Sequence, residues 1–161
     1  MKKKLLFVCL GNICRSPAAE AIAQKIIDER GLHDLFYVDS AGIHGMHHGE
    51  PADRRMRMEA SKRDYNVTSI SRPVTTDDYD EYDLLIGMDD SNIQALYDKA
   101  PTLETSRKII KMADYLNEGN KWDHIPDPYY GGQDGFTLVL DLLEEAIGNL
   151  IEDLSEASVN R

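Results

Sequence analysis

The chain has 161 residues, of which 29 are acidic and 18 are basic, for a net charge of −11. This length suits one domain with a full core. The acidic balance argues against a nucleic-acid partner, because phosphate backbones attract Lys and Arg. No stretch approaches the ~18 apolar residues of a membrane span, so no membrane partner is expected. The chain has two cysteines and no disulfide framework, which favours a reducing, cytoplasmic setting.

A continuous apolar run over residues 4–9 predicts a first strand, of the kind that is buried on both faces in a parallel sheet. Lysines precede it, but the run is too short for a signal peptide, and polar residues follow at once. Ser16 is then expected to cap a helix whose first residue is Pro17. Gly31 is expected to end this helix. Its apolar face consists of Ala19, Ile22, Ala23, Ile26 and Ile27.

Strand-like and helix-like segments continue to alternate along the rest of the chain. Three have the pattern of buried strands: residues 36–40, 83–88 and 108–112. Three are expected to be helical: residues 53–64, a segment that opens at 89–92, and the apolar stripe over 136–154. Three are expected to be irregular: residues 43–53, 65–79 and 123–132. Residues 1–161 are therefore predicted to form one α/β domain, with its ligand site at the carboxyl ends of the strands.

The segment between the first strand and the first helix carries the candidate chemistry. Cys9 and Arg15 bracket a short loop at a helix N-terminus, where backbone N–H groups and the helix dipole favour a tetrahedral anion. The same dipoles and a nearby arginine would activate Cys9 as a nucleophile. Arg15 would hold two phosphate oxygens through its planar guanidinium. This pattern predicts phosphoryl transfer through a cysteine.

Three motifs together resemble the low-molecular-weight protein tyrosine phosphatase family. They are Cys9-x5-Arg15-Ser16 directly after the first strand, Asp39-Ser40-Ala41-Gly42, and Asp127-Pro128-Tyr129-Tyr130 near the C-terminus. The similarity extends over essentially the whole chain. It implies a three-layer fold in which a four-stranded parallel sheet, in order 2-1-3-4, has helices on both faces. It also implies hydrolysis of phosphotyrosine through a phosphocysteine, with no cofactor and no metal.

The resemblance also implies roles for individual residues. Cys9 would attack phosphorus, Arg15 would clamp the phosphate, and Asp127 would protonate the leaving phenolate and then activate water. Taken alone, the Asp-Pro pair is also typical of a turn. Ser16 would bond to the Cys9 sulfur and ease its departure. The phosphate would further contact the loop residues Leu10, Gly11, Asn12, Ile13 and Cys14.

Asn12 and Cys14 of the loop are expected to act in ways other than direct catalysis. The resemblance suggests that Asn12 braces the loop from a left-handed backbone conformation by bonding to Ser40. A histidine that joins this network in the family is replaced by Ser69, to which no role is assigned. Cys14 has two interpretations that stay open. It would either pack beneath the loop or act as a redox partner that protects Cys9 through a reversible disulfide.

The expected pocket walls determine which phosphate fits. The resemblance makes Tyr129 a wall for the substrate ring and Tyr130 its neighbour at the rim. Met46 stands where relatives usually carry an aromatic residue, and its thioether would form a softer wall. The histidines around Met46 are expected to be solvated rather than to hold a metal. Ile13 favours an aromatic leaving group, because the protein-arginine phosphatase branch of the family carries Thr at that position.

Three functions besides phosphotyrosine hydrolysis share features of this pattern. A protein-arginine phosphatase shares the loop but not Ile13. An arsenate reductase would need cysteines beyond Cys14, and a non-catalytic phosphate-binding module would not require both Cys9 and Asp127. The expected partner is a tyrosine-phosphorylated protein or peptide, which leaves open whether that protein is a tyrosine kinase. The expected product is inorganic phosphate.

Overall fold

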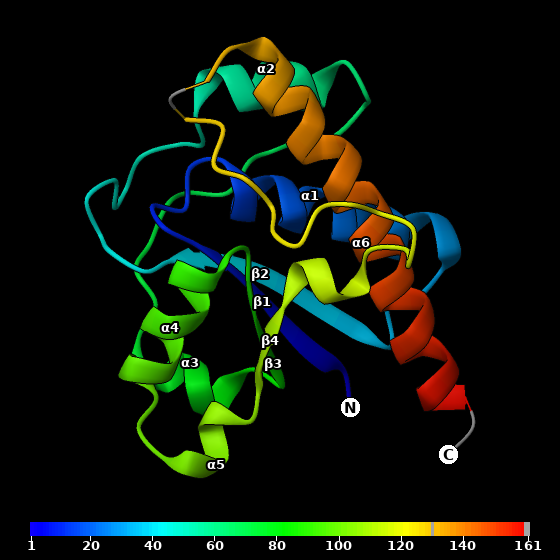
Figure 1. Cartoon of the computed structure of the whole chain (residues 1–161). Helices are drawn as coiled ribbons and strands as arrows, with labels where there is room; N and C mark the ends of the chain where they lie inside the picture. Colours follow the sequence, from blue (N-terminus) through cyan, green and yellow to red (C-terminus); the bar gives the residue numbers. More distant parts are fainter. Residues whose placement is uncertain (130, 160–161) are drawn as a thin grey trace.

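A central sheet lies between two layers of helices in the computed structural model, which describes residues 1–129 and 131–159 (Figure 1). The strands are β1 (Lys3–Cys9), β2 (Phe36–Gly42), β3 (Leu84–Gly87) and β4 (Ile109–Lys111). All of their pairings are parallel, in the order β2-β1-β3-β4. The predicted fold class and strand order are therefore confirmed.

The central strand β1 separates two cores, because successive side chains of a strand point to opposite faces. Leu5 and Phe7 face the core beneath α1 (Arg15–Arg30) and α6 (Gln133–Val159), whereas Leu6 and Val8 face the other core. The remaining helices are α2 (Arg54–Ser61) on the α6 side, and α3 (Thr76–Glu81), α4 (Asp90–Lys99) and α5 (Leu103–Ser106). No helix within residues 1–129 and 131–159 has the length and apolar character that crossing a membrane requires.

The sequence prediction was wrong for several short elements and for one strand end. The stretch before Tyr79 was expected to be irregular, yet α3 starts within it, and Thr75 and Asp78 form a capping box there. The one-turn helix α5 and the 3-10 helix η1 (Met112–Tyr115) were not predicted. A helix of one turn has too few apolar positions to show a period. Strand β2 also runs two residues past Ser40, because Ala41 and Gly42 pair with the end of β1.

The start of α1 differs from the prediction in a way that bears on function. Ser16 was expected to be the N-cap, but the helix begins at Arg15, and Cys14 holds the cap position without a capping hydrogen bond. The Ser16 hydroxyl is instead turned towards the Cys9 sulfur. The first turn also contains no acidic residue. In this turn the Ser16 N–H points to the Cys9 sulfur, at 3.4 Å.

Candidate active site

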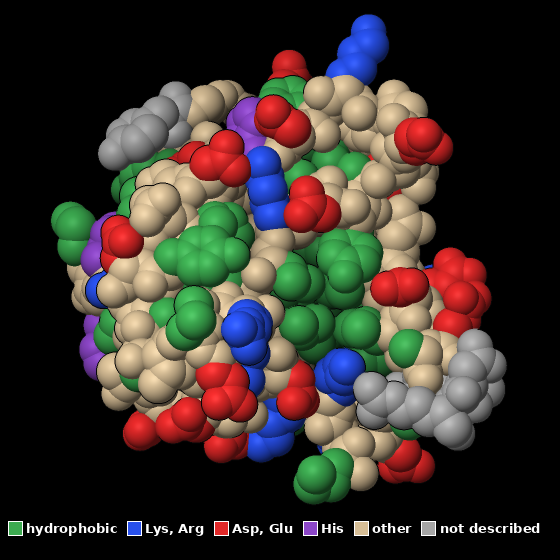
Figure 2. Space-filling view, turned by 60° about the horizontal axis from the view of Figure 1, so that its bottom comes forward, with side chains coloured by type: hydrophobic (Ala, Val, Ile, Leu, Met, Phe, Trp, Pro, Cys, Tyr) green, Lys and Arg blue, Asp and Glu red, His purple; other side chains and the backbone are tan. Residues whose placement is uncertain are grey.

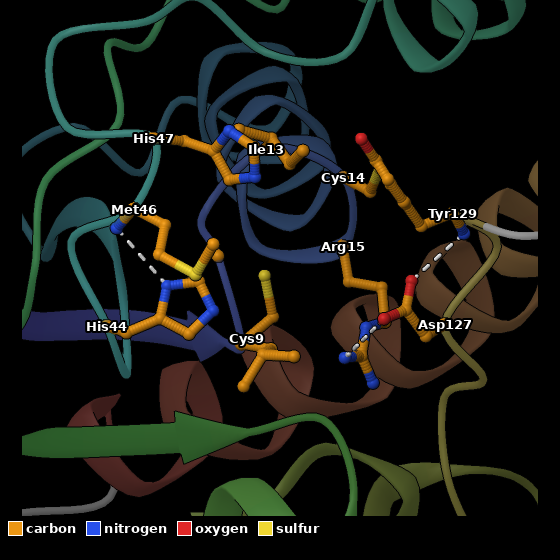
Figure 3. A pocket seen from close by; sticks show the side chains of 11 residues that line it. Cys9, Ile13, Cys14, Arg15, His44, Met46, His47, Asp127 and Tyr129 are labelled. Atoms are coloured by element: carbon orange, nitrogen blue, oxygen red, sulfur yellow. Dashed lines mark hydrogen bonds and ion pairs between the residues drawn. The ribbon is translucent and has the colours of Figure 1, made fainter.

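A cavity of about 330 Å³ opens where β1 ends and α1 begins. Figure 3 shows Cys9 and Arg15 between His44, Met46 and His47 on one side and Asp127 and Tyr129 on the other. The sequence predicted every lining residue except two histidines. The full lining is Cys9, Leu10, Gly11, Ile13, Cys14, Arg15, His44, Met46, His47, Asp127 and Tyr129. The predicted rim residue Tyr130 lies outside the described residues.

The backbone of the loop over residues 9–16 is bonded to protein through its carbonyls. Gly11 O accepts from Ser71 Oγ at 3.0 Å, and Ile13 O accepts from Asp53 N at 2.7 Å. In the described part of the chain, by contrast, the N–H groups of residues 11–14 have no protein acceptor. Backbone N–H groups are rarely left unpaired away from water. This row of donors is therefore arranged for an anion in the cavity.

Asn12 holds this loop in shape. Its φ of 57° lies in the left-handed region that asparagine tolerates better than most residues. Its Nδ2 donates to Ser16 Oγ at 2.8 Å and to Ser40 Oγ at 3.1 Å. Its Oδ1 accepts from Arg72 N at 3.0 Å. The expected Asn12–Ser40 contact is present, and Arg72 and Ser71 complete the network around the loop.

Close approach of β2 to this loop depends on Gly42. A Cβ at Gly42 would lie 3.0 Å from both the Asn12 nitrogen and the Gly11 carbonyl carbon. Those atoms are backbone and cannot move aside without reshaping the loop. The Ser40-Ala41-Gly42 motif therefore supplies both a brace and the space in which the loop fits.

The Cys9 sulfur lies at the base of the cavity and is bonded to Ser16. Its Sγ is 3.1 Å from Ser16 Oγ and 3.4 Å from Ser16 N. Because Ser16 Oγ already accepts from Asn12, its own proton can point to Cys9 Sγ or to Ala41 O, which is 3.3 Å away. Two possible donors thus lie within hydrogen-bond reach of the sulfur.

Arg15 is buried, with 2% of its surface exposed, and is anchored at one nitrogen. Its Nη1 donates to Asp89 Oδ2 at 2.7 Å and to Ile125 O at 2.9 Å. These bonds leave Nε and Nη2 available for phosphate oxygens. Burial opposes the charge on Arg15, but Cys9 and Asp89 outweigh this effect and raise the pKa of its guanidinium. The sequence did not identify Asp89 or Ile125 as part of the site.

Asp127 reaches the same cavity from the loop before α6. Its Oδ2 is 3.7 Å from Arg15 Nη2, and its Oδ1 accepts from Tyr129 N at 3.0 Å. The Asp-Pro pair therefore forms a turn and also presents a carboxyl group to the cavity, so its two interpretations are compatible. This turn places the Tyr129 ring at the rim, with the Arg55 guanidinium 5.3 Å from the ring centroid.

The wall opposite Tyr129 contains histidines as well as the predicted Met46. Met46 is exposed at the mouth of the cavity, and its N–H donates to His44 Nδ1. His47 is paired with Glu50 at 2.7 Å, and its ring centroid lies 6.4 Å from that of Tyr129. His44 and His47 are half-buried and line the cavity, a position that the sequence did not predict for them. No group of three or more His, Cys, Asp and Glu residues within 1–129 and 131–159 is arranged for a metal.

Cys14 packs in the core beneath the loop, as one of its two interpretations expected. Only 4% of its surface is exposed, and both cysteines are free thiols. Burial, followed by the charge of Asp53, raises the pKa of the Cys14 thiol well above its ordinary value. The thiolate of Cys14 is therefore disfavoured, and the redox role stays a prediction.

Glu20 extends the bracing network away from the cavity. Its Oε1 accepts from Ser40 Oγ at 2.7 Å, so it lies one hydrogen bond beyond Asn12. Burial of the carboxyl group raises its pKa from the ordinary 4.5 to about 6. The folded protein therefore holds this proton more tightly than the unfolded chain does, and charging Glu20 destabilises the fold.

We expect Glu20→Gln to remove a pH dependence of stability. The stabilising contribution of Glu20 is fully present below about pH 4.5 and is lost as the pH rises through about 6. The unfolding free energy of the variant, relative to wild type, should therefore rise by about 1–2 kcal/mol between pH 4.5 and 7.5. Urea unfolding at the two pH values measures this difference.

The matched control is Glu29→Gln, which removes an exposed charge from the same helix. Its difference from wild type should be the same at both pH values. If the unfolding free energy of Glu20→Gln relative to wild type does not change with pH, the charge on Glu20 does not destabilise the fold.

Comparison with known proteins gives consistent matches over nearly the full chain. A family model described as low molecular weight phosphotyrosine protein phosphatase matches residues 4–160. A putative low molecular weight protein-tyrosine-phosphatase of Synechocystis is 45% identical over 158 residues, which cover 98% of this chain and 99% of the relative. The human low molecular weight phosphotyrosine protein phosphatase is 36% identical over 138 residues, covering 85% and 86%.

A solved structure has the same fold. The protein tyrosine phosphatase from Entamoeba histolytica, crystallised with Hepes in the active site, superposes with a TM-score of 0.93. It is 47% identical in sequence, and the match covers 98% of this chain and 99% of that one.

Proposed function

This chain belongs to the low molecular weight phosphotyrosine protein phosphatase family and is a protein-tyrosine phosphatase, and on that premise we propose that it works through a phosphocysteine formed on Cys9. The observation that carries the proposal is the arrangement of the 9–16 loop. Among the described residues, the N–H groups of residues 11–14 have no protein acceptor, and Gly11, Ile13 and Cys14 line the same cavity as Cys9 and Arg15. Anion donors around a nucleophile are what phosphoryl transfer requires.

In the first step, the Cys9 thiolate attacks phosphorus as the bond to the phenolic oxygen breaks. The loop N–H groups and the Arg15 atoms Nε and Nη2 hold the equatorial oxygens as their charge develops. Asp127 gives its proton to the departing phenolate.

In the second step, water hydrolyses the phosphocysteine. The Asp127 carboxylate takes a proton from the water as its oxygen attacks phosphorus, the sulfur–phosphorus bond breaks, and inorganic phosphate is released. Cys9 leaves as a thiolate that Ser16 stabilises, because the Ser16 hydroxyl and N–H both lie within hydrogen-bond reach of its sulfur. This mechanism uses a free thiol, so the proposal includes a reducing, cytoplasmic setting.

The cavity walls support phosphotyrosine as the substrate. Ile13 and Tyr129 both line the cavity, so the leaving group meets an apolar side chain and an aromatic ring. A phenyl ring gains from stacking and from burial of its area, whereas a guanidinium would need an acceptor near Ile13. The partner is then a tyrosine-phosphorylated protein, and a tyrosine kinase is included in that class.

A panel of three phosphopeptides with one common sequence tests this proposal. We expect the kcat/KM for phosphotyrosine to exceed that for phosphoarginine and phosphoserine by at least about 100-fold, since each poorly matched leaving group loses stacking or proton transfer. Phosphate release is the measurement. A preference for phosphoarginine would assign the chain to the other branch, and tight binding with no turnover of any peptide would indicate a phosphate-binding module.

A further inference from the structure

The helix α2 begins with a cluster of arginines that local physics does not favour. Arg54, Arg55 and Arg57 occupy its first turn, which has no acidic residue. The helix dipole disfavours cations at this end of a helix. A chain with a net charge of −11 also has no compositional reason to gather basic residues here. Local rules of this kind are broken mainly at functional sites.

This end of α2 is attached to the catalytic loop and to the rim of the cavity. Asp53 N, at the N-cap of the helix, donates to Ile13 O of the loop at 2.7 Å. The Arg55 guanidinium lies over the rings of Tyr129 and Phe136, at 5.3 and 4.8 Å from their centroids. It is also held by the Asp53 carboxylate at 2.9 Å. The first turn of α2 therefore borders the cavity on the Tyr129 side.

Arg54 and Arg57 carry their charges on the open face of this helix. Both are exposed, and neither forms an ion pair with a carboxylate in the part of the chain that the structure describes. Arg57 Nε donates to Ala52 O at 2.9 Å, which holds one edge of its guanidinium. Both arginines line a shallow surface hollow. The complete lining of this hollow, called the α2 basic surface from here on, is Arg54, Arg57, Met58, Ser61 and Lys62.

We propose that the α2 basic surface binds acidic residues that flank the phosphotyrosine, so that the preferred substrates are phosphotyrosines in acidic sequences. This inference rests on the proposed function, because it concerns the part of the peptide that extends from the same cavity. A phosphorylated acidic peptide is repelled by the overall charge of the chain. It is attracted by arginines that have no carboxylate partner among the described residues and that lie on the helix bordering the cavity. The effect of each exposed arginine is small and is screened by salt.

The end of the molecule opposite α2 has a different distribution of charged side chains. Figure 2 brings forward the lower end of Figure 1, and acidic side chains lie around the margin of that face with single basic side chains between them. Lys99 and Arg107 precede β4, at the edge of the sheet away from the cavity, and both are exposed. They provide a control pair of equal charge to Arg54 and Arg57.

The test compares two phosphotyrosine peptides that differ only in their flanks, Asp and Glu in one and Asn and Gln in the other. We expect wild type to prefer the acidic peptide by about three- to tenfold in kcat/KM at low salt, and by less at 0.5 M NaCl. In the double variant Arg54→Gln/Arg57→Gln this ratio should fall to near one, while kcat/KM for p-nitrophenyl phosphate stays within twofold. The control variant Lys99→Gln/Arg107→Gln should keep the wild-type ratio.

A wild-type ratio of one or below would overturn the proposal, as would equal losses in the two double variants, which would assign the effect to net charge. Binding of the same peptides to the Cys9→Ser variant, followed by fluorescence anisotropy, separates this proposal from the proposed function. If wild type hydrolyses neither peptide nor p-nitrophenyl phosphate, the proposed function fails. The affinity ratio of acidic to neutral peptide, and its loss on removal of Arg54 and Arg57, still decides the role of the α2 basic surface.

Discussion

Cys9→Ser is expected to lower kcat for p-nitrophenyl phosphate by more than about 10⁴-fold, because a hydroxyl at this position is a far weaker nucleophile than a thiolate. The anion site itself should survive. Arg15 and the N–H groups of residues 11–14 do not depend on the sulfur for their positions, since Asp89, Ile125 and Asn12 hold them. Steady-state kinetics measures the first effect, and calorimetric titration with phosphate measures the second.

The matched control is Cys14→Ala, which removes the other thiol of the same loop. Cys14 packs beneath the loop, so this variant should lose some stability but retain kcat within about tenfold of wild type. Near-normal turnover in Cys9→Ser, or a complete loss in Cys14→Ala with phosphate still bound, would contradict a phosphocysteine on Cys9.

Asp127→Asn is expected to make the rate depend steeply on the leaving group. An amide cannot supply a proton, so aryl phosphates with basic phenolates should lose about 10²–10⁴-fold in kcat/KM. Substrates with acidic phenols need little protonation and should lose much less. The amide oxygen can still accept from Tyr129 N, as Oδ1 does now at 3.0 Å, so the turn is preserved. A series of substituted phenyl phosphates measures the slope of log rate against phenol pKa.

Asp89→Asn is a sharp comparison, because it replaces the other carboxylate near Arg15. Asp89 bonds to Nη1 on the side of Arg15 that is anchored to protein, so its loss weakens the phosphate clamp for every substrate alike. All members of the series should then slow by a similar factor, and the slope should not change. Equal losses across the series in Asp127→Asn would remove Asp127 from the acid role.

The 9–16 loop is the part of the site that could be predicted from the sequence. The Cys9 and Arg15 spacing, the preceding apolar run and Pro17 are contiguous in the chain, and they predicted an anion loop at a helix N-terminus. The resemblance added Asp127 and the Asn12–Ser40 contact. These expectations depend on local backbone geometry or on motifs that can be read directly from the chain.

Residues that join the site from distant segments were missed. Asp89 signals a helix cap by its sequence, and it does cap α4 through Oδ1, which accepts from Asn92 N. Its Oδ2 binds Arg15 only because β3 pairs with β1 and brings their carboxyl ends together. Ile125 contributes through a backbone carbonyl, which no side-chain pattern can indicate. The prediction for His47 rested on the composition of its own loop, whereas in the fold its ring lies next to that of Tyr129.

By itself, the sequence predicted an anion loop and its candidate reacting groups, because these rest on short-range spacing and recognisable motifs, and the sheet order followed from the family that those motifs resemble. The tertiary structure decided how those groups are held and what surrounds them. Strand pairing anchors Arg15 at one nitrogen, and the contact of α2 with the loop places Arg55 at the rim. Burial at the end of the brace shifts the pKa of Glu20. These properties depend on which surfaces meet in space, and spacing along the chain does not contain that information.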